Sequence, residues 1–299
     1  GYLRIATTDA QGNYTLSGLP AGTYTLTPSK GGYTFSPNPP SITVPPNRPG
    51  VDFKGYDKFP IVFVHGWNGL IRDPLCNQVE PDDYFEQIDE QLQAANYYVG
   101  YARLNSTWCG TPAIWRNALL LDDAIQHAKI VTNRSRVILI AHSMGGLVSR
   151  AYVEGDKYDD DVASLFTFGS PHQGVPTDVT TLLALRAYLD GYSSLGEYCS
   201  DEKQEAACEF TVGMGIKEFN ENYSTRRDGV NYHIISGAAP FLPRTPRGIL
   251  GDRLLQGSDD GAVQTASGLG LSGDLDRWQT GEAHADLFGP NNYFANHVR

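Results

Sequence analysis

One short stretch of the chain combines a serine with small residues in a pattern suited to nucleophilic chemistry. In "ILIAHSMGGLVSR" (138–150), an apolar run ends at Ala141, Ser143 follows, and Gly145 lies two residues further on. A serine hydroxyl is presented to a base by a sharp strand-to-helix turn, and such a turn leaves room only for small residues two positions before and after the serine. The stretch therefore predicts a nucleophilic serine at Ser143. The alternative interpretation is a serine that only caps a helix.

Attack by a serine on a carbonyl group also requires hydrogen-bond donors for the oxyanion that forms. Each preorganised donor lowers the barrier by about 3–4 kcal/mol. A His-Gly turn occurs in "VHGWNG" (64–69), at the end of an earlier apolar run. We expect the backbone N–H groups of Met144, directly after the serine, and of Trp67, in this turn, to be the two donors.

A nucleophilic serine on a strand-turn-helix needs an acid and then a base later in the chain. Asp260 is the preferred acid, with its neighbour Asp259 and the earlier Asp178 as alternatives. Downstream of these lie His284 and His297. His284 is the preferred base, because His297 is close to the chain end, where order is doubtful.

From residue 55 onward, short apolar runs alternate with helical stretches, which is typical of a mostly parallel sheet with helices on both faces. The first-turn preference of proline predicts a helix that starts at Pro112 and covers 112–131. The expected strands cover 59–66, 97–104, 136–143, 162–169 and 231–237. In such sheets ligands bind beyond the carboxyl ends of the strands, which is where the His-Gly turn and Ser143 lie.

Residues 1–54 have a different pattern and predict a small all-β module ahead of a larger domain over 55–299. The stretch "GNYTLSGLPAGTYTLTPSKGGYTF" (12–35) alternates polar and apolar residues on both sides of "SGLPAG" (17–22), which predicts a hairpin. Several prolines between positions 37 and 49 exclude a helix there and restrict any strand to a sheet edge.

Composition narrows the function class. The chain has 299 residues and a net charge of −11, and it has no basic stripe, which argues against nucleic acid as a partner. No apolar run reaches the roughly 18 residues that span a membrane. Because the first residue is Gly1 rather than methionine, we expect that a signal peptide or another upstream segment has been removed.

Four cysteines, an even number without CxxC spacing, predict two disulfides and a secreted protein. Three pairings are possible, and the preferred one joins Cys76 to Cys109 and Cys199 to Cys208. Buried free thiols are the alternative.

The stretches "VHGWNG", "AHSMGG" and "FGSPHQG" (168–174) are spaced as in the α/β-hydrolase superfamily. The chain from 56 to 299 resembles its secreted bacterial lipases and esterases, including the triacylglycerol lipase and PGAP1-like group. The resemblance implies an α/β-hydrolase fold with a cap or lid over 175–230 and a triad of Ser143, Asp260 and His284. The family's Asp-Gly-x-Val phrase begins at Asp260, and Ala141 replaces its usual first glycine.

The same resemblance implies hydrolysis of lipid or other apolar esters, at a lipid–water interface or a polymer surface, without a metal or organic cofactor in the chemistry. A structural Ca²⁺ is a further option, since Asp286 has the spacing of a ligand in some bacterial lipases. The stretch 7–37 resembles part of a carboxypeptidase-regulatory-like, prealbumin-type β module, and such modules serve as spacers or binding accessories.

Three other functions stay open. The first is a PGAP1-like deacylase or thioesterase, and the second is a cutinase-like polyester hydrolase. The third is a non-catalytic binding protein on an inactive hydrolase scaffold, although such proteins usually lose one of the three triad residues.

Overall fold

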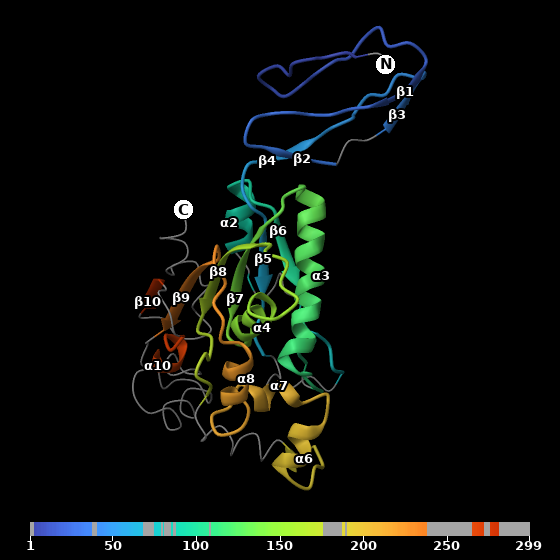
Figure 1. The fold of residues 1–299 in the computed structure, drawn as a ribbon. Coiled ribbons are helices and arrows are strands. Elements are labelled where there is room, and N and C mark those ends of the chain that lie inside the picture. Colours follow the sequence, from blue (N-terminus) through green and yellow to red (C-terminus); the bar gives the residue numbers. More distant parts are fainter. Residues whose placement is uncertain are drawn as a thin grey trace. The chain divides into compact units, whose positions relative to one another are not determined.

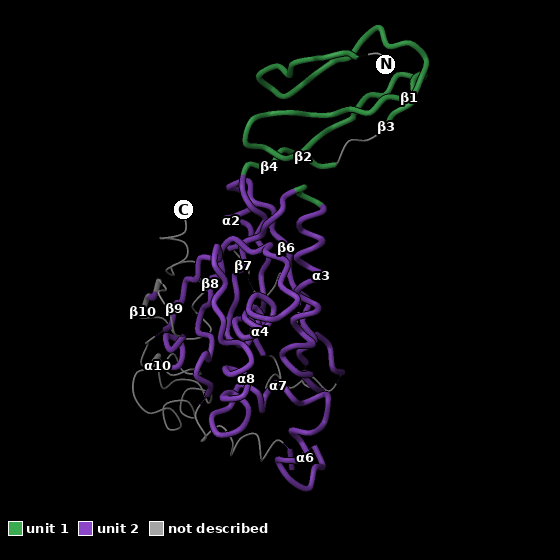
Figure 2. The backbone as a smooth tube through the Cα atoms, in the orientation of Figure 1, with its two compact units in different colours: residues 1–57, 131–133 green, residues 58–130, 134–299 purple. Residues whose placement is uncertain are grey.

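The computed structural model describes residues 3–37, 41–67, 75–78, 80, 85, 88–107, 109–175, 187–188, 190–237, 265–271 and 276–280. The chain forms two compact units, shown in Figure 2. Unit 1 contains residues 1–57 together with 131–133, and unit 2 contains 58–130 and 134–299.

Unit 1 consists of two small antiparallel sheets. The strands are β1 (Gly22–Thr25), β2 (Thr34–Ser36), β3 (Ser41–Val44) and β4 (Lys54–Tyr56). β1 pairs with β3, and β2 pairs with β4. The hairpin expected around 17–22 is therefore wrong: residues 13–19 form no strand, and β1 finds its partner sixteen residues downstream. Every strand of these sheets is an edge, which is why the proline-flanked β3 is accommodated.

Unit 2 is built on a six-stranded parallel sheet with the order β10-β9-β8-β7-β5-β6 (Figure 1). The strands are β5 (Ile61–Val64), β6 (Val99–Ala102), β7 (Val137–His142), β8 (Val162–Phe168), β9 (Asn231–Gly237) and β10 (Asp276–Thr280). Five of them lie within the expected apolar runs. The sixth, β10, is not evident from the sequence, because its residues are mostly polar.

Alternating side chains of the strands divide the core between the two faces of the sheet. The helices are α2 (Ile88–Ala94), α3 (Ile114–Thr132), α4 (Met144–Val153), α6 (Leu195–Ser200), α7 (Glu205–Glu209), α8 (Ile216–Asn222) and α10 (Thr265–Gly268). Val62 and Val64 of β5 pack with α3 and α4, whereas Ile61 and Phe63 pack with α2 on the opposite face. Helices therefore cover both faces of the sheet, and this confirms the predicted α/β-hydrolase arrangement.

Helix α3 corresponds to the predicted helix, and α6, α7 and α8 lie in the segment expected to form a cap. Among the described residues, no helix is both long and apolar enough to cross a bilayer.

Candidate active site

Ser143 occupies the turn between β7 and α4. It is the residue directly before the first residue of α4, and its backbone has φ 53° and ψ −127°. A positive φ is uncommon for a residue with a side chain and costs about 1–3 kcal/mol, so it persists only where the surroundings fix it. One such constraint is the hydrogen bond from the Ser143 N–H to the Phe168 carbonyl of β8, at 2.9 Å.

Two glycines allow α4 to pack closely behind this turn. A Cβ atom on Gly145 would lie 2.3 Å from the Val64 carbonyl oxygen and 2.6 Å from that of His65. A Cβ on Gly146 would lie 2.0 Å from Oγ of Ser170. The glycines therefore let the serine turn and the end of β5 touch through their backbones.

The register of the sheet places the two expected oxyanion donors at matching positions. β5 and β7 are neighbouring parallel strands in which Val64 pairs with Ala141. Trp67 and Met144 each lie three residues beyond this pair. Met144 is the first residue of α4, where a backbone N–H has no acceptor within the helix.

The side chain of His65 holds the loop that carries Trp67. Its Nε2 accepts a hydrogen bond from the Leu104 N–H at 3.2 Å, and its Nδ1 lies 2.9 Å from the Gly66 carbonyl oxygen. Burial lowers the pKa of His65, in spite of these hydrogen bonds.

The proposed acid and base lie outside the described residues. Asp260 falls in the connection between β9 and α10, and His284 falls after β10. Both strands run parallel to β7. The alternatives Asp259, Asp178 and His297, and the calcium candidate Asp286, lie outside the described residues as well.

A buried ion cluster on α4, which the sequence analysis missed, anchors the helix behind the serine. Arg150 and Glu154 are 1% and 0% exposed in their side chains, and Glu154 also pairs with Arg226. Arg150 donates to the Asn220 side chain and to the Tyr223 carbonyl. Burial lowers the pKa of Arg150 to about 10, and Glu154 opposes this shift. The cluster thus ties α4 to α8.

The loop over 169–174 connects three parts of the site. Asn220 of α8 donates to the His172 carbonyl at 2.9 Å. The hydroxyl of Ser267 in α10 accepts from the Gln173 N–H at 3.1 Å and donates to the Gly174 carbonyl at 2.6 Å. The loop therefore joins α8 to α10, the helix that follows Asp260 in the chain.

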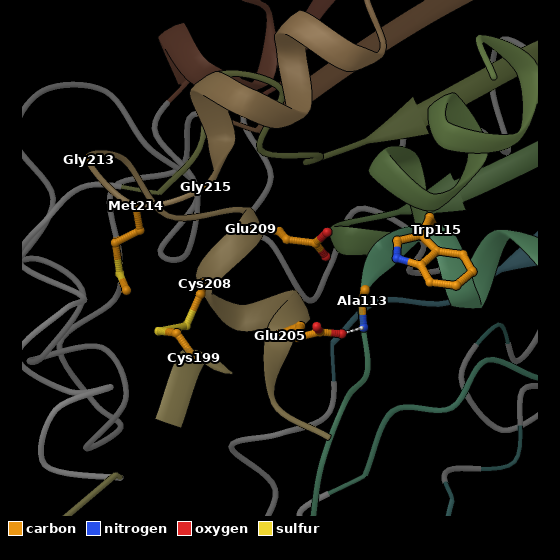
Figure 3. A pocket seen from close by; sticks show the side chains of 9 residues that line it. All are labelled: Ala113, Trp115, Cys199, Glu205, Cys208, Glu209, Gly213, Met214 and Gly215. Atoms are coloured by element: carbon orange, nitrogen blue, oxygen red, sulfur yellow. Dashed lines mark hydrogen bonds between the residues drawn. A yellow bond between two sulfur atoms is a disulfide. The ribbon is translucent and has the colours of Figure 1, made fainter. Parts of the chain in front are cut away.

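Two disulfides cross-link unit 2, and side-chain capping attaches α7 to the start of α3. The structure contains the Cys76–Cys109 and Cys199–Cys208 disulfides, the pairing preferred from the sequence. The Glu205 and Glu209 carboxylates accept the backbone N–H groups of Ala113 and Ile114 at the start of α3. Figure 3 shows both carboxylates directed towards α3 and away from the disulfide.

A cavity of about 480 Å³ lies where α7 and the loop after it meet the start of α3. The described residues that line it include Trp115, Met214 and the two glutamates, but neither Ser143 nor Trp67 (Figure 3). Burial raises the pKa of Glu209, while the Ile114 N–H opposes this shift. The side chains of Glu205 and Glu209 thus cap α3 and attach α7 to it.

The parallel sheet, the strained serine turn and the covering helices define the class of fold: it is the α/β-hydrolase fold. Residues 56–204 match the family of the PGAP1-like alpha/beta domain. Triacylglycerol lipases from Pseudarthrobacter phenanthrenivorans and Burkholderia plantarii are each 28% identical over 196 residues. The matched region is 61% of this chain and 59% and 52% of those two relatives.

Solved structures show the same fold. The mature form of the Bacillus licheniformis lipase BlEst2 matches with a TM-score of 0.59 at 21% identity, over 93% of this chain and 97% of the other. The Staphylococcus hyicus lipase matches with a TM-score of 0.51 at 16% identity, over 80% of this chain and 90% of the other.

Proposed function

We propose that the chain is a secreted carboxylic-ester hydrolase of the lipase and esterase type, with Ser143 as its nucleophile. The observation that carries the proposal is the positive φ of Ser143 at the end of a central parallel strand. A serine that only caps a helix has an ordinary extended backbone and needs no such strain. A nucleophile needs it, because the turn presents Oγ beyond the sheet.

The mechanism uses a triad of Ser143, His284 and Asp260. His284 takes the Oγ proton as Oγ attacks the ester carbonyl carbon, and the tetrahedral intermediate then expels the alcohol, which receives that proton. Asp260 holds the imidazole in the required tautomer and stabilises the imidazolium. Water repeats the cycle on the acyl-enzyme and releases the acid. In support, the three residues follow β7, β10 and β9, which are parallel and so end at one edge of the sheet.

The backbone N–H groups of Trp67 and Met144 form the oxyanion hole. Their equal offset from the paired residues Val64 and Ala141 supports this role. The oxyanion thus receives one hydrogen bond from the loop after β5 and one from the start of α4, where the helix dipole also favours negative charge.

The substrates are lipid or other apolar esters, which the enzyme meets at a lipid–water interface or a polymer surface. Two matched relatives carry the name triacylglycerol lipase, which supports this substrate class. Residues 175–230 are the cap or lid of the catalytic domain 55–299, and residues 1–54 are an accessory spacer module. Two disulfides support export to an oxidising compartment.

A second candidate function is deacylation of lipid-anchored or acylated molecules, including thioesters. The match of residues 56–204 to the PGAP1-like family favours it. It uses the same triad. A hydrolase of aromatic polyesters is a third candidate with the same mechanism.

Hydrolysis of p-nitrophenyl esters tests the shared chemistry. Ser143→Ala lowers kcat by at least about 10⁴-fold, because it removes the nucleophile. Ser200→Ala, at an exposed serine, is the matched control and retains activity. Equal activity in the wild type and Ser143→Ala would reject the proposal. Series of oxygen esters and thioesters of increasing chain length, with an aromatic polyester, then separate the three substrate classes.

Paired substitutions test the acid and the base. His284→Ala and Asp260→Asn each lower kcat by about 10⁴-fold. Their controls His297→Ala and Asp259→Asn carry the same chemical change at the neighbouring candidate and keep most of the activity. If a control rather than its partner abolishes turnover, the triad assignment changes to that residue.

A further inference from the structure

The side chain of His65 forms a hydrogen bond with the peptide group between Gly66 and Trp67. His65 is 2% exposed and contacts two backbones: its Nε2 meets the Leu104 N–H at 3.2 Å, and its Nδ1 meets the Gly66 carbonyl oxygen at 2.9 Å. Leu104 lies 39 residues further along the chain, just after β6. One imidazole thus links the loop after β5 to the loop after the neighbouring strand.

These contacts select one tautomer of His65. A backbone N–H can only donate, so Nε2 must be the acceptor of the hydrogen bond from Leu104 and carries no proton. The proton of the neutral ring is then on Nδ1, which donates it to the Gly66 carbonyl oxygen. Burial lowers the pKa of His65, which agrees with a neutral ring.

The carbonyl oxygen of Gly66 and the N–H of Trp67 belong to the same peptide group. This peptide is trans, since the cis bonds among the described residues are all at prolines in unit 1. In a trans peptide the C=O and N–H point in opposite directions. Holding the Gly66 oxygen on the His65 side therefore fixes the direction in which the Trp67 N–H points.

The flanking residues leave this peptide little freedom to rotate. On one side, the carbonyl oxygens of Val64 and His65 lie against Gly145 with no room for a Cβ. On the other side, the Trp67 ring packs edge-on against Phe210 at 5.5 Å between centroids. The His65 imidazole supplies a third restraint, at the Gly66 carbonyl between these two contacts.

We propose that His65, through its Nδ1–H bond to the Gly66 carbonyl, is a positioning residue that aims the Trp67 N–H at the oxyanion of the substrate. The proposal rests on the proposed ester-hydrolase function. His65 itself touches neither the substrate nor the reacting atoms. Its contribution is realised in the transition state, since the oxyanion forms only there.

Three substitutions separate positioning from a general structural role. In His65→Asn, the side-chain amide nitrogen replaces Nδ1 and keeps the donor to Gly66. In His65→Gln, the amide replaces Nε2 and loses that donor, and His65→Leu loses both hydrogen bonds. Loss of a well-aimed oxyanion donor costs up to about 10²–10³-fold in kcat, so a misdirected donor in His65→Gln and His65→Leu lowers kcat about 10- to 100-fold.

The positioning role predicts that KM stays within about 2-fold in these variants, because the substrate carbonyl is bound before the oxyanion exists. Affinity for a boronic acid transition-state analogue falls in parallel with kcat/KM. His65→Asn recovers most of the wild-type kcat. A general structural role would instead make His65→Asn as impaired as His65→Gln, with losses that follow the drop in Tm, and this result would overturn the proposal.

A measurement on the unaltered protein gives an independent check. Nitrogen-15 NMR of the His65 ring at pH 8, assigned with His65→Asn, should show the neutral Nδ1–H tautomer. A proton on Nε2 at this pH would overturn the proposal. If Ser143→Ala remained active, the ester-hydrolase function itself would fail. If Ser143→Ala were inactive and His65→Leu had normal kcat and analogue affinity, the positioning role alone would fail.

Discussion

The glycines of the two units differ in what surrounds them. In unit 1, a Cβ added to any of five glycines would meet nothing within 4 Å: Gly12, Gly18, Gly31, Gly32 and Gly50. In unit 2, Gly145 and Gly146 lie against backbone and side-chain atoms at distances that no Cβ tolerates. These five glycines of unit 1 are therefore not required by close packing, whereas Gly145 and Gly146 of unit 2 are.

The two units also differ in how many of their described residues are buried. Tyr56 is the only buried residue among those described in residues 1–57, whereas all four residues of β5 in unit 2 are buried. A strained residue such as Ser143 needs surroundings that overdetermine its backbone. Unit 2 provides them, and this difference explains why chemistry is expected there and a spacer role in unit 1.

The largest expected effect on stability comes from the ion cluster of unit 2. Glu154→Gln leaves the buried Arg150 and the adjacent Arg226 without their carboxylate. Breaking such a pair lowers the free energy of unfolding by about 3–5 kcal/mol. Glu221→Gln, in an exposed pair with Lys217, changes it by less than about 0.5 kcal/mol. Urea denaturation followed by circular dichroism measures both, and equal effects would contradict the role of the buried cluster.

The glycine comparison predicts the next largest effect. Gly145→Ala forces the serine turn away from the end of β5 and lowers the free energy of unfolding by about 1–3 kcal/mol. It also lowers kcat, since the shifted backbone carries the oxyanion loop. Gly31→Ala, where the added methyl group meets open space, is the control and leaves both stability and activity near wild type. Normal kcat in Gly145→Ala would show that this contact is dispensable.

Mild acidification, from pH 7 to pH 5, titrates histidines, and all seven lie beyond residue 57. Burial, with the charges of Arg150 and Arg226, lowers the pKa of His172 well below its usual value. Below about pH 6.5 the unfolded chain therefore binds a proton that the folded state does not. Stability falls as the pH falls, by up to about 1.4 kcal/mol per pH unit for this residue. Thermal unfolding at pH 7 and pH 5 checks this. An unchanged slope in His172→Gln would contradict it.

The smallest effect is predicted for unit 1. The Tyr14 hydroxyl donates to the Val51 carbonyl at 2.6 Å, and its ring contacts Phe53. Tyr14→Phe removes the hydrogen bond alone and lowers the stability of unit 1 by about 1 kcal/mol. Hydrogen exchange localises the change to residues 1–57, and ester hydrolysis stays at the wild-type rate. A matching loss of kcat would show that unit 1 takes part in catalysis.

Features that depend only on residues close together in the chain could be predicted from the sequence. Short apolar runs located five strands of the sheet, and the small residues around Ser143 located the strained turn. Strand β10 could not be found in this way, because an edge strand with one neighbour tolerates the polar residues Asp276, Arg277 and Gln279.

Contacts between distant segments were not accessible from the sequence. Arg150 and Glu154 are four residues apart and resemble an exposed helix pair, and their burial depends on α8 and Arg226, some 70 residues later. The link between His65 and Leu104 spans 39 residues in the same way. In unit 1, alternation located β1 but not its partner, because β1 pairs with β3, which follows sixteen residues later, and residues 13–19 form no strand.

Labelling with a fluorophosphonate tests the central claim most directly, because such reagents react with an activated serine and not with an ordinary hydroxyl. Trypsin cleavage after Arg136 and Arg150 releases the peptide 137–150, which contains Ser143 and Ser149. The account predicts one adduct on this peptide, placed on Ser143 by fragment masses and absent from His284→Ala. An adduct on Ser149 or on another peptide, or no adduct in the wild-type protein, would contradict it.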